Sequence, residues 1–145
     1  MKALIQRVKK ASVSINSELY SEIGAGMLVL LGVEKGDSEE NASKLAQKLV
    51  SLRIFEDSDG KMNKSILDIN GEMLVVSQFT LCGDCKKGTR PSFDKAAAPE
   101  IAQSLYETFV KNVKTHDIKV ETGKFRAMME VSLINDGPVT FMVEK

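Results

Sequence analysis

Residues 27–33 read Met27-Leu28-Val29-Leu30-Leu31-Gly32-Val33, an apolar run without a charged side chain that follows Gly24 and Gly26. A continuous apolar run of this length is typical of a strand that is buried on both faces. Such a strand needs further strands beside it and other elements above and below it. This stretch therefore predicts the centre of a sheet, and the segments around it should supply the neighbours.

The segments before this run predict antiparallel strands. Residues 2–8 alternate between polar and apolar side chains, as a half-buried strand does. Residues 11–15 and 19–23 have a similar character and flank Asn16-Ser17, which predicts a hairpin turn.

The segments after the run predict two helices and further strands. A cap at Asp37 or Ser38 should start the first helix, whose apolar residues recur at helical spacing at Ala42, Leu45, Ala46, Leu49 and Leu52. Pro99 suits the first turn of a second helix, which continues through Ile101, Leu105, Phe109 and Val113. Apolar or alternating runs at 53–55, 73–81, 127–133 and 139–143 predict strands, the last two joined at residues 135–138.

Length and composition indicate a single domain. The chain has 145 residues, of which 43% are hydrophobic, enough to bury one core and hardly enough for two. No internal repeat, low-complexity tract or Pro/Gly/Ser-rich linker divides it. We therefore expect one α+β domain over residues 1–145: a curved, mostly antiparallel sheet or partial β-barrel with two helices.

Charge and hydropathy narrow the class of partner. Twenty Lys and Arg residues balance twenty Asp and Glu residues, which argues against broad duplex binding but leaves room for a small contact with the end of an RNA. No segment approaches the roughly 18 apolar residues that span a bilayer, and residues 1–7 lack the apolar run of a signal peptide. We expect a soluble, cytoplasmic protein with no membrane partner.

The two cysteines, Cys82 and Cys85, have CxxC spacing but are too few for a disulfide framework. A structural zinc site needs about four ligands, and the chain offers no second Cys/His pair. A thioredoxin-like motif would open a helix, whereas this one follows a strand. We interpret the spacing as incidental and expect neither a metal ion nor a cofactor.

The polar end of the strand at 73–81, Ser77-Gln78-Phe79-Thr80, is a candidate site because a rigid strand positions its last residues at a rim. Ordinary strand-end polarity would give the same pattern. A nucleophilic Thr80 would need a nearby base, and the only histidine, His116, lies in a polar stretch typical of solvated surface. Catalysis here would therefore depend on positioning and on backbone hydrogen-bond donors.

Two loops allow alternative interpretations. Asn135-Asp136-Gly137-Pro138 is a strong turn signal, and it is equally a rigid backbone element suited to exclude a ligand by shape. The loop at 86–93 clusters three positive charges, Lys86, Lys87 and Arg90, with one aromatic residue. Such a cluster is either a solvated surface or a cationic patch for phosphate.

Seven segments in chain order carry a resemblance to a known family: Ile5-Gln6-Arg7-Val8, Leu31-Gly32-Val33, Arg53-Ile54-Phe55, Lys61-Met62-Asn63, residues 77–81, Arg90-Pro91-Ser92-Phe93 and residues 135–140. Together they resemble the D-aminoacyl-tRNA deacylases over essentially the whole chain. The resemblance implies a homodimeric enzyme that hydrolyses the ester between a D-amino acid and the terminal adenosine of tRNA. The rival hypothesis is a non-catalytic, dimeric nucleic-acid-binding module that uses loop 86–93.

The resemblance also implies roles for named residues. Ser77, Gln78, Phe79 and Thr80 would form the floor of the catalytic site, where backbone N–H groups around Phe79 and Thr80 bind the oxyanion. Gly137-Pro138 resembles a cis Gly-Pro element that reaches into the partner's site and excludes L-side chains, so glycyl-tRNA would be a second substrate. The remaining expected contributors are Arg7, Asn135, Val139 and Thr140 as supports, Met129 as a lining residue, and Lys86, Lys87 and Arg90 as tRNA contacts.

Two details qualify the resemblance. The family allows Thr80 to act as nucleophile or to position the substrate with help from a ribose hydroxyl, and the missing base favours positioning. Arg126 departs from the family pattern, because a small residue is expected after Phe125.

Overall fold

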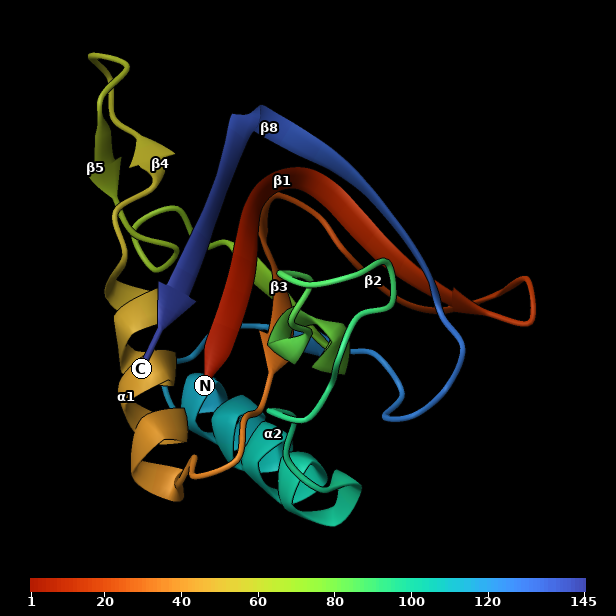
Figure 1. Cartoon of the computed structure of the whole chain (residues 1–145). Coiled ribbons are helices and arrows are strands. Elements are labelled where there is room, and N and C mark those ends of the chain that lie inside the picture. Colours follow the sequence, from red (N-terminus) through yellow and green to blue (C-terminus); the bar gives the residue numbers. More distant parts are fainter.

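A pair of long, bent strands, β1 (Lys2–Ile15) and β8 (Glu130–Glu144), dominates the computed structural model, which describes residues 1–145. The two strands run antiparallel along almost their whole length. The other edge of β1 pairs first with β3 (Gly26–Gly32) and then, beyond the bend, with β2 (Glu18–Ile23). Figure 1 shows β1 and β8 arching together over the rest of the sheet.

Parallel strands continue the sheet on the far side of β3. β3 pairs with β6 (Glu72–Ser77), and β6 pairs with β7 (Val120–Thr122). The Ser21 hydroxyl of β2 donates to the carbonyl oxygen of Thr122 in β7 at 2.9 Å, so the outer strands meet and the sheet nearly closes into a barrel. A small hairpin of β4 (Phe55–Glu56) and β5 (Met62–Lys64) stands apart.

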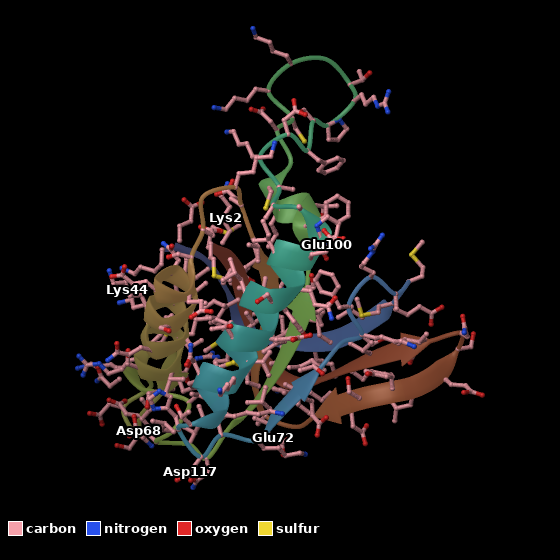
Figure 2. The ribbon with its side chains drawn as sticks, turned by 90° about the horizontal axis from the view of Figure 1, so that it is seen from below. Lys2, Lys44, Asp68, Glu72, Glu100 and Asp117 are labelled. Carbon is pink, nitrogen blue, oxygen red and sulfur yellow. The ribbon has the colours of Figure 1, made fainter.

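Two helices, α1 (Glu39–Ser51) and α2 (Pro99–Lys114), pack against each other on one face of this sheet (Figures 1 and 2). The apolar side chains between helices and sheet form the larger of two buried clusters, and a smaller one fills the concave face of the sheet. β3 contributes to both, since Val29 belongs to the larger cluster and Leu28 to the smaller, each with 0% exposure. The predicted doubly buried strand and the predicted fold class are therefore confirmed.

Several predicted boundaries were wrong. Residues 2–8 and 11–15 belong to one strand, β1, and residues 130–133 and 139–143 belong to another, β8, whereas residues 127–129 precede it. Bulges let β1 and β8 bend without breaking their pairing. Residues 135–138 therefore do not reverse the chain. The strand predicted at 73–81 ends at Ser77 and is followed by a short 3₁₀ turn, η1 (Phe79–Cys82).

Local capping explains where α1 starts. Ser38 is the cap: its hydroxyl accepts from the Asn41 N–H, and the Asn41 side chain accepts from the Ser38 N–H. Asp37, the alternative cap, instead accepts from the N-terminal ammonium of Met1 at 2.6 Å.

Neither helix is both long enough and apolar enough to cross a membrane.

Candidate active site

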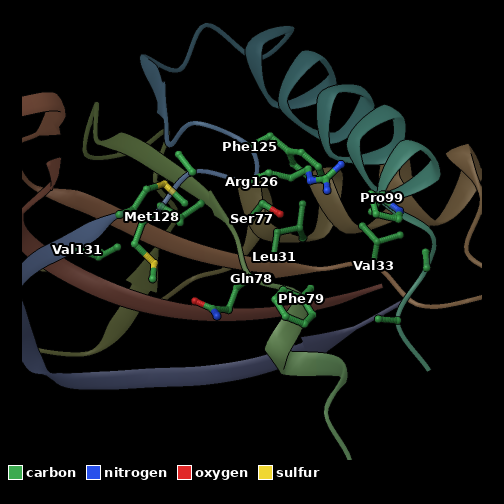
Figure 3. Close-up of a pocket in the computed structure, with 16 residues that line it drawn as sticks. Leu31, Val33, Ser77, Gln78, Phe79, Pro99, Phe125, Arg126, Met128 and Val131 are labelled. Carbon is green, nitrogen blue, oxygen red and sulfur yellow. The ribbon is translucent and has the colours of Figure 1, made fainter. Parts of the chain in front are cut away.

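A cavity of about 690 Å³ opens where β6 ends, between the start of α2 and the segment that leads into β8 (Figure 3). Its volume is typical of a site for a small molecule or for one nucleotide. Most of the lining side chains are apolar, and the polar exceptions are Ser77, Gln78 and Arg126. Three of the four predicted floor residues line it, namely Ser77, Gln78 and Phe79, and so does Met129.

The fourth floor residue, Thr80, lies just outside this lining on η1 and is exposed. Its hydroxyl oxygen accepts a hydrogen bond from the Gln78 side-chain amide. The bonds of this turn run from Leu81 N–H to Gln78 C=O and from Gly83 N–H to Thr80 C=O. The N–H groups of Phe79 and Thr80 thus stand at the start of the turn, where helical geometry offers no internal acceptor.

The basic loop is attached beside this strand end. Asp84 and Ser92 exchange backbone hydrogen bonds of 2.8 and 3.0 Å, which close the loop at its base. The Phe93 ring then packs on the Phe79 ring with centroids 5.0 Å apart. Lys86, Lys87 and Arg90 are exposed on the projecting part, which Figure 2 shows beyond Glu100 and clear of the body.

A second group of predicted residues holds the Gly137-Pro138 loop, whose peptide bond is cis. Arg7 is only 5% exposed, and its side chain donates through Nε to the Asp136 carbonyl at 2.8 Å and through Nη1 to the Ile54 carbonyl at 2.8 Å. Its Nη2 also donates to a Glu56 carboxylate oxygen at 3.2 Å. Arg7 therefore fixes the loop to the body of the domain.

Asn135 holds the same loop from its other side. Its side-chain oxygen accepts from the Val139 N–H at 2.7 Å, and its amide donates to the Val139 carbonyl at 3.1 Å and to the Thr140 hydroxyl at 3.0 Å. The loop is consequently held at both ends, while Gly137 and Pro138 themselves remain exposed.

Within one chain, the cavity floor and the Gly137-Pro138 loop lie at different positions along β1. The floor is level with Ala3, because Ser77 pairs with Leu31 and Leu31 pairs with Ala3. The Gly137-Pro138 loop lies beside Arg7, four residues further along the same strand. Four residues of strand span about 13 Å. No residue of this loop lines the cavity.

The remaining candidates lie away from the cavity. His116 is exposed and lines a separate shallow groove with α1 and the loop at 65–68. Cys82 is buried, which raises the pKa of its thiol, and its Sγ donates to the Val33 carbonyl, while Cys85 is exposed. No group of three or more His, Cys, Asp and Glu side chains is placed to hold a metal ion.

Sequence reasoning did not identify several lining residues. Ala97 and Pro99 line the cavity from the segment that starts α2, and Phe125 and Arg126 line it from the approach to β8. Apolar residues at helix starts and in short loops carry no periodic signal, so only the fold brings them to the strand end. Only Arg126 could have been singled out from the sequence, because an arginine departs from the family pattern at this position.

Comparisons with known proteins cover the whole chain. The family model described as D-Tyr-tRNA(Tyr) deacylase matches residues 4–144. The D-aminoacyl-tRNA deacylase of Pelobacter propionicus is 58% identical over 145 residues, with 100% of both chains covered. That of Geotalea uraniireducens is 60% identical over 144 residues, 99% of this chain and 93% of the relative. A solved structure named c-Myc DNA Unwinding Element Binding Protein matches with a TM-score of 0.94 and 40% identity, over 100% of this chain and 99% of that one. With matches of this extent and identity, the chain belongs to the D-Tyr-tRNA(Tyr) deacylase family.

Proposed function

We propose that this chain hydrolyses the ester bond of D-aminoacyl-tRNA and releases free tRNA and the D-amino acid. The observation that carries the proposal is the position of the cavity: an apolar space of nucleotide size is lined by Ser77, Gln78 and Phe79, where β6 ends and η1 begins. Full-length relatives named D-aminoacyl-tRNA deacylase support the same reaction.

In the proposed mechanism the terminal adenosine occupies the cavity and its ester carbonyl lies against Phe79 and Thr80. Their N–H groups donate to the oxygen that becomes negative as water attacks. One well-placed donor of this kind lowers the barrier by about 3–4 kcal/mol. The polar side chains of the floor, Ser77, Gln78 and Thr80, are uncharged, so catalysis depends on positioning and on backbone donors.

We propose that chirality is read by exclusion, and by a second copy of the chain. The Gly137-Pro138 loop is exposed, and it lies some 13 Å along β1 from the position of Ala3, which is level with Ser77 and the cavity. The loop is therefore better placed to enter a partner's cavity than its own. Exposed apolar side chains on β8 flank it and offer a surface for a homodimer: Ile134, Phe141 and Met142. Backbone carbonyls in that position would reject an L-side chain and admit glycine, so glycyl-tRNA is a proposed second substrate.

The basic loop is the proposed contact for the tRNA acceptor end. Lys86, Lys87 and Arg90 form no ion pair within the chain, and the Phe79–Phe93 contact keeps the loop beside the site. A patch of three charges suits a short single-stranded end better than a duplex.

The test of the proposal is hydrolysis of matched D- and L-tyrosyl-tRNA in the presence of a chelator. We expect the D-ester to be hydrolysed at least about 100-fold faster, since exclusion by a rigid backbone costs the L-ester several kcal/mol. Comparable rates on the two esters would contradict exclusion. Tight binding of tRNA without release of either amino acid would favour the rival hypothesis.

That rival, a non-catalytic nucleic-acid-binding dimer, has one specific observation in its favour. The solved structure with 40% identity is named as a protein that binds a DNA unwinding element. Binding and hydrolysis are separable in the same assay, because a duplex DNA competitor should leave deacylation unchanged if the cavity accepts only an aminoacylated RNA end.

We expect Thr80→Ala to retain at least about one third of the wild-type rate of the chemical step, because the proposed donors are main-chain N–H groups and no base faces the Thr80 hydroxyl. Single-turnover hydrolysis of D-tyrosyl-tRNA measures this directly. Complete loss of turnover with unchanged substrate binding would instead identify Thr80 as the nucleophile.

A further inference from the structure

Arg126 is the only charged residue among those that line the cavity. Its side chain is exposed and forms no hydrogen bond or ion pair within the chain. Figure 3 shows it reaching toward Pro99, on the side of the cavity away from Val131. An unpaired guanidinium on an apolar cavity is a strong potential anchor for an anion, because it offers several donors in a planar fork.

The backbone at Arg126 adds a second observation. The N–H of Ala127 donates to the Lys124 carbonyl at 3.1 Å and closes a turn in which Arg126 is the third residue, with φ of 63°. A positive φ at this position favours glycine, so an arginine is disfavoured there on conformational grounds. Residues in such sparsely populated conformations cluster at functional sites, where the surrounding structure maintains them.

The chemistry of the substrate indicates which anion this arginine meets. If the cavity holds the terminal adenosine, as the proposed function requires, the constant negative charge nearest the ester is the phosphodiester on the 5′ oxygen of that adenosine. The amino-acid side chain varies among substrates, and the α-amino group carries the opposite charge. We propose that Arg126 binds this 5′-phosphate and thereby positions the terminal nucleotide in the cavity.

The inference rests on the proposed function, but binding measurements separate the two. Two non-hydrolysable probes are compared, a 3′-D-tyrosylamino-3′-deoxyadenosine and the same compound with a 5′-phosphate. We expect the wild-type protein to bind the phosphorylated probe about tenfold more tightly, which is the usual effect of one charge-assisted contact. Arg126→Gln should abolish this difference, Arg126→Lys should restore most of it, and both should bind the unphosphorylated probe within twofold of wild type.

Two controls exclude a structural explanation. Lys124→Gln removes a charge from the same turn at a residue that does not line the cavity, and should leave the phosphate preference intact. Arg126→Gly suits the positive φ, so it should lose the preference without any fall in Tm. With tRNA, Arg126→Gln should also lower the slope of log affinity against log salt by about 0.7, as expected for the loss of one contact to a single strand.

The outcomes are distinct. Equal weakening of both probes by Arg126→Gln, or a phosphate preference that survives this substitution, would overturn the assignment. Failure of the wild-type protein to bind either probe would overturn it as well. Phosphate-dependent binding together with no hydrolysis of D-tyrosyl-tRNA would uphold the role of Arg126 and refute the proposed activity.

Discussion

Gly137→Ala should lower kcat/KM for D-tyrosyl-tRNA by about 100-fold or more. A Cβ at this position would lie 2.6 Å from Val139 Cγ2, 2.9 Å from the Val139 backbone nitrogen and 3.2 Å from Arg7 Nη2, and Gly137 has φ of +143°. The backbone nitrogen cannot yield as a flexible side chain does, so the Gly137 carbonyl must move. A misplacement of about 1 Å in a positioning element is enough for a loss of this size.

Gly60→Ala is the matched control for backbone conformation. Gly60 also has a positive φ, +73°, but a Cβ there would have no neighbour within 4 Å. It lies in the turn between β4 and β5, outside the cavity lining and the basic loop, so both the deacylation rate and the D/L ratio should remain close to those of wild type. Normal D-selective turnover by Gly137→Ala would refute the role proposed for the loop.

Mixing two inactive variants tests whether the loop serves the neighbouring subunit. Phe79→Pro removes the N–H proposed to bind the oxyanion at the first position of η1, where proline fits a helical turn. A mixed dimer of Phe79→Pro and Gly137→Ala chains contains one intact floor facing one intact loop. Random reassociation should restore about a quarter of the wild-type activity. No recovery, with mixed dimers demonstrated, would place both elements in the same subunit's site.

Arg7→Ala should have the largest effect on folding among the site residues. Arg7 is 5% exposed and satisfies the buried Ile54 carbonyl at 2.8 Å as well as the Asp136 carbonyl. Its removal leaves those acceptors without donors and should lower the free energy of unfolding by about 2–3 kcal/mol, or Tm by about 4–12 °C. Because Asp136 precedes Gly137, deacylation should also fall about tenfold at temperatures where the variant is folded.

Lys9→Ala provides the comparison for Arg7. Lys9 also faces Asp136, with Nζ 4.0 Å from its carboxylate, but its side chain is 69% exposed. An exposed ion pair contributes at most about 1 kcal/mol, so both Tm and activity should change little. Thermal unfolding and single-turnover deacylation of the two variants provide the readout. An Arg7→Ala protein with the Tm of Lys9→Ala would refute the anchoring role.

The sequence predicted those parts of the fold whose pattern is local. The apolar run at 27–33 and the helical spacing from Ala42 to Leu49 are visible within the segment itself, whatever the rest of the chain packs against it. Both elements form as expected. Asn16-Ser17 turns the chain with positive φ at both residues, as its composition predicts. The strand continuity of β8 was missed because Asn135 supplies from its side chain the hydrogen bonds that keep the 136–138 loop inside the strand.

The candidate site was predictable in composition but not in arrangement. Ser77–Thr80, Arg7 and Gly137-Pro138 were identified from resemblance, whereas periodicity alone left each open to an ordinary structural explanation. The contact of Phe93 with Phe79 and the position of Arg126 depend on where the loops at 84–96 and 124–129 return to the sheet. Loop conformations of this kind are set by tertiary packing, which a single sequence does not encode in any short pattern.

The distance along β1 between the cavity and the Gly137-Pro138 loop has a consequence for how this protein responds to dilution. If the floor and the excluding loop come from different subunits, a single chain has a cavity but lacks the loop that excludes L-side chains from it. Discrimination between D- and L-esters would then be a property of the assembled pair and would follow mass action. Stereochemical fidelity would depend on the concentration of the protein. A mutation that weakens only the subunit contact would then alter which esters are cleaved without changing any residue at the reacting bond.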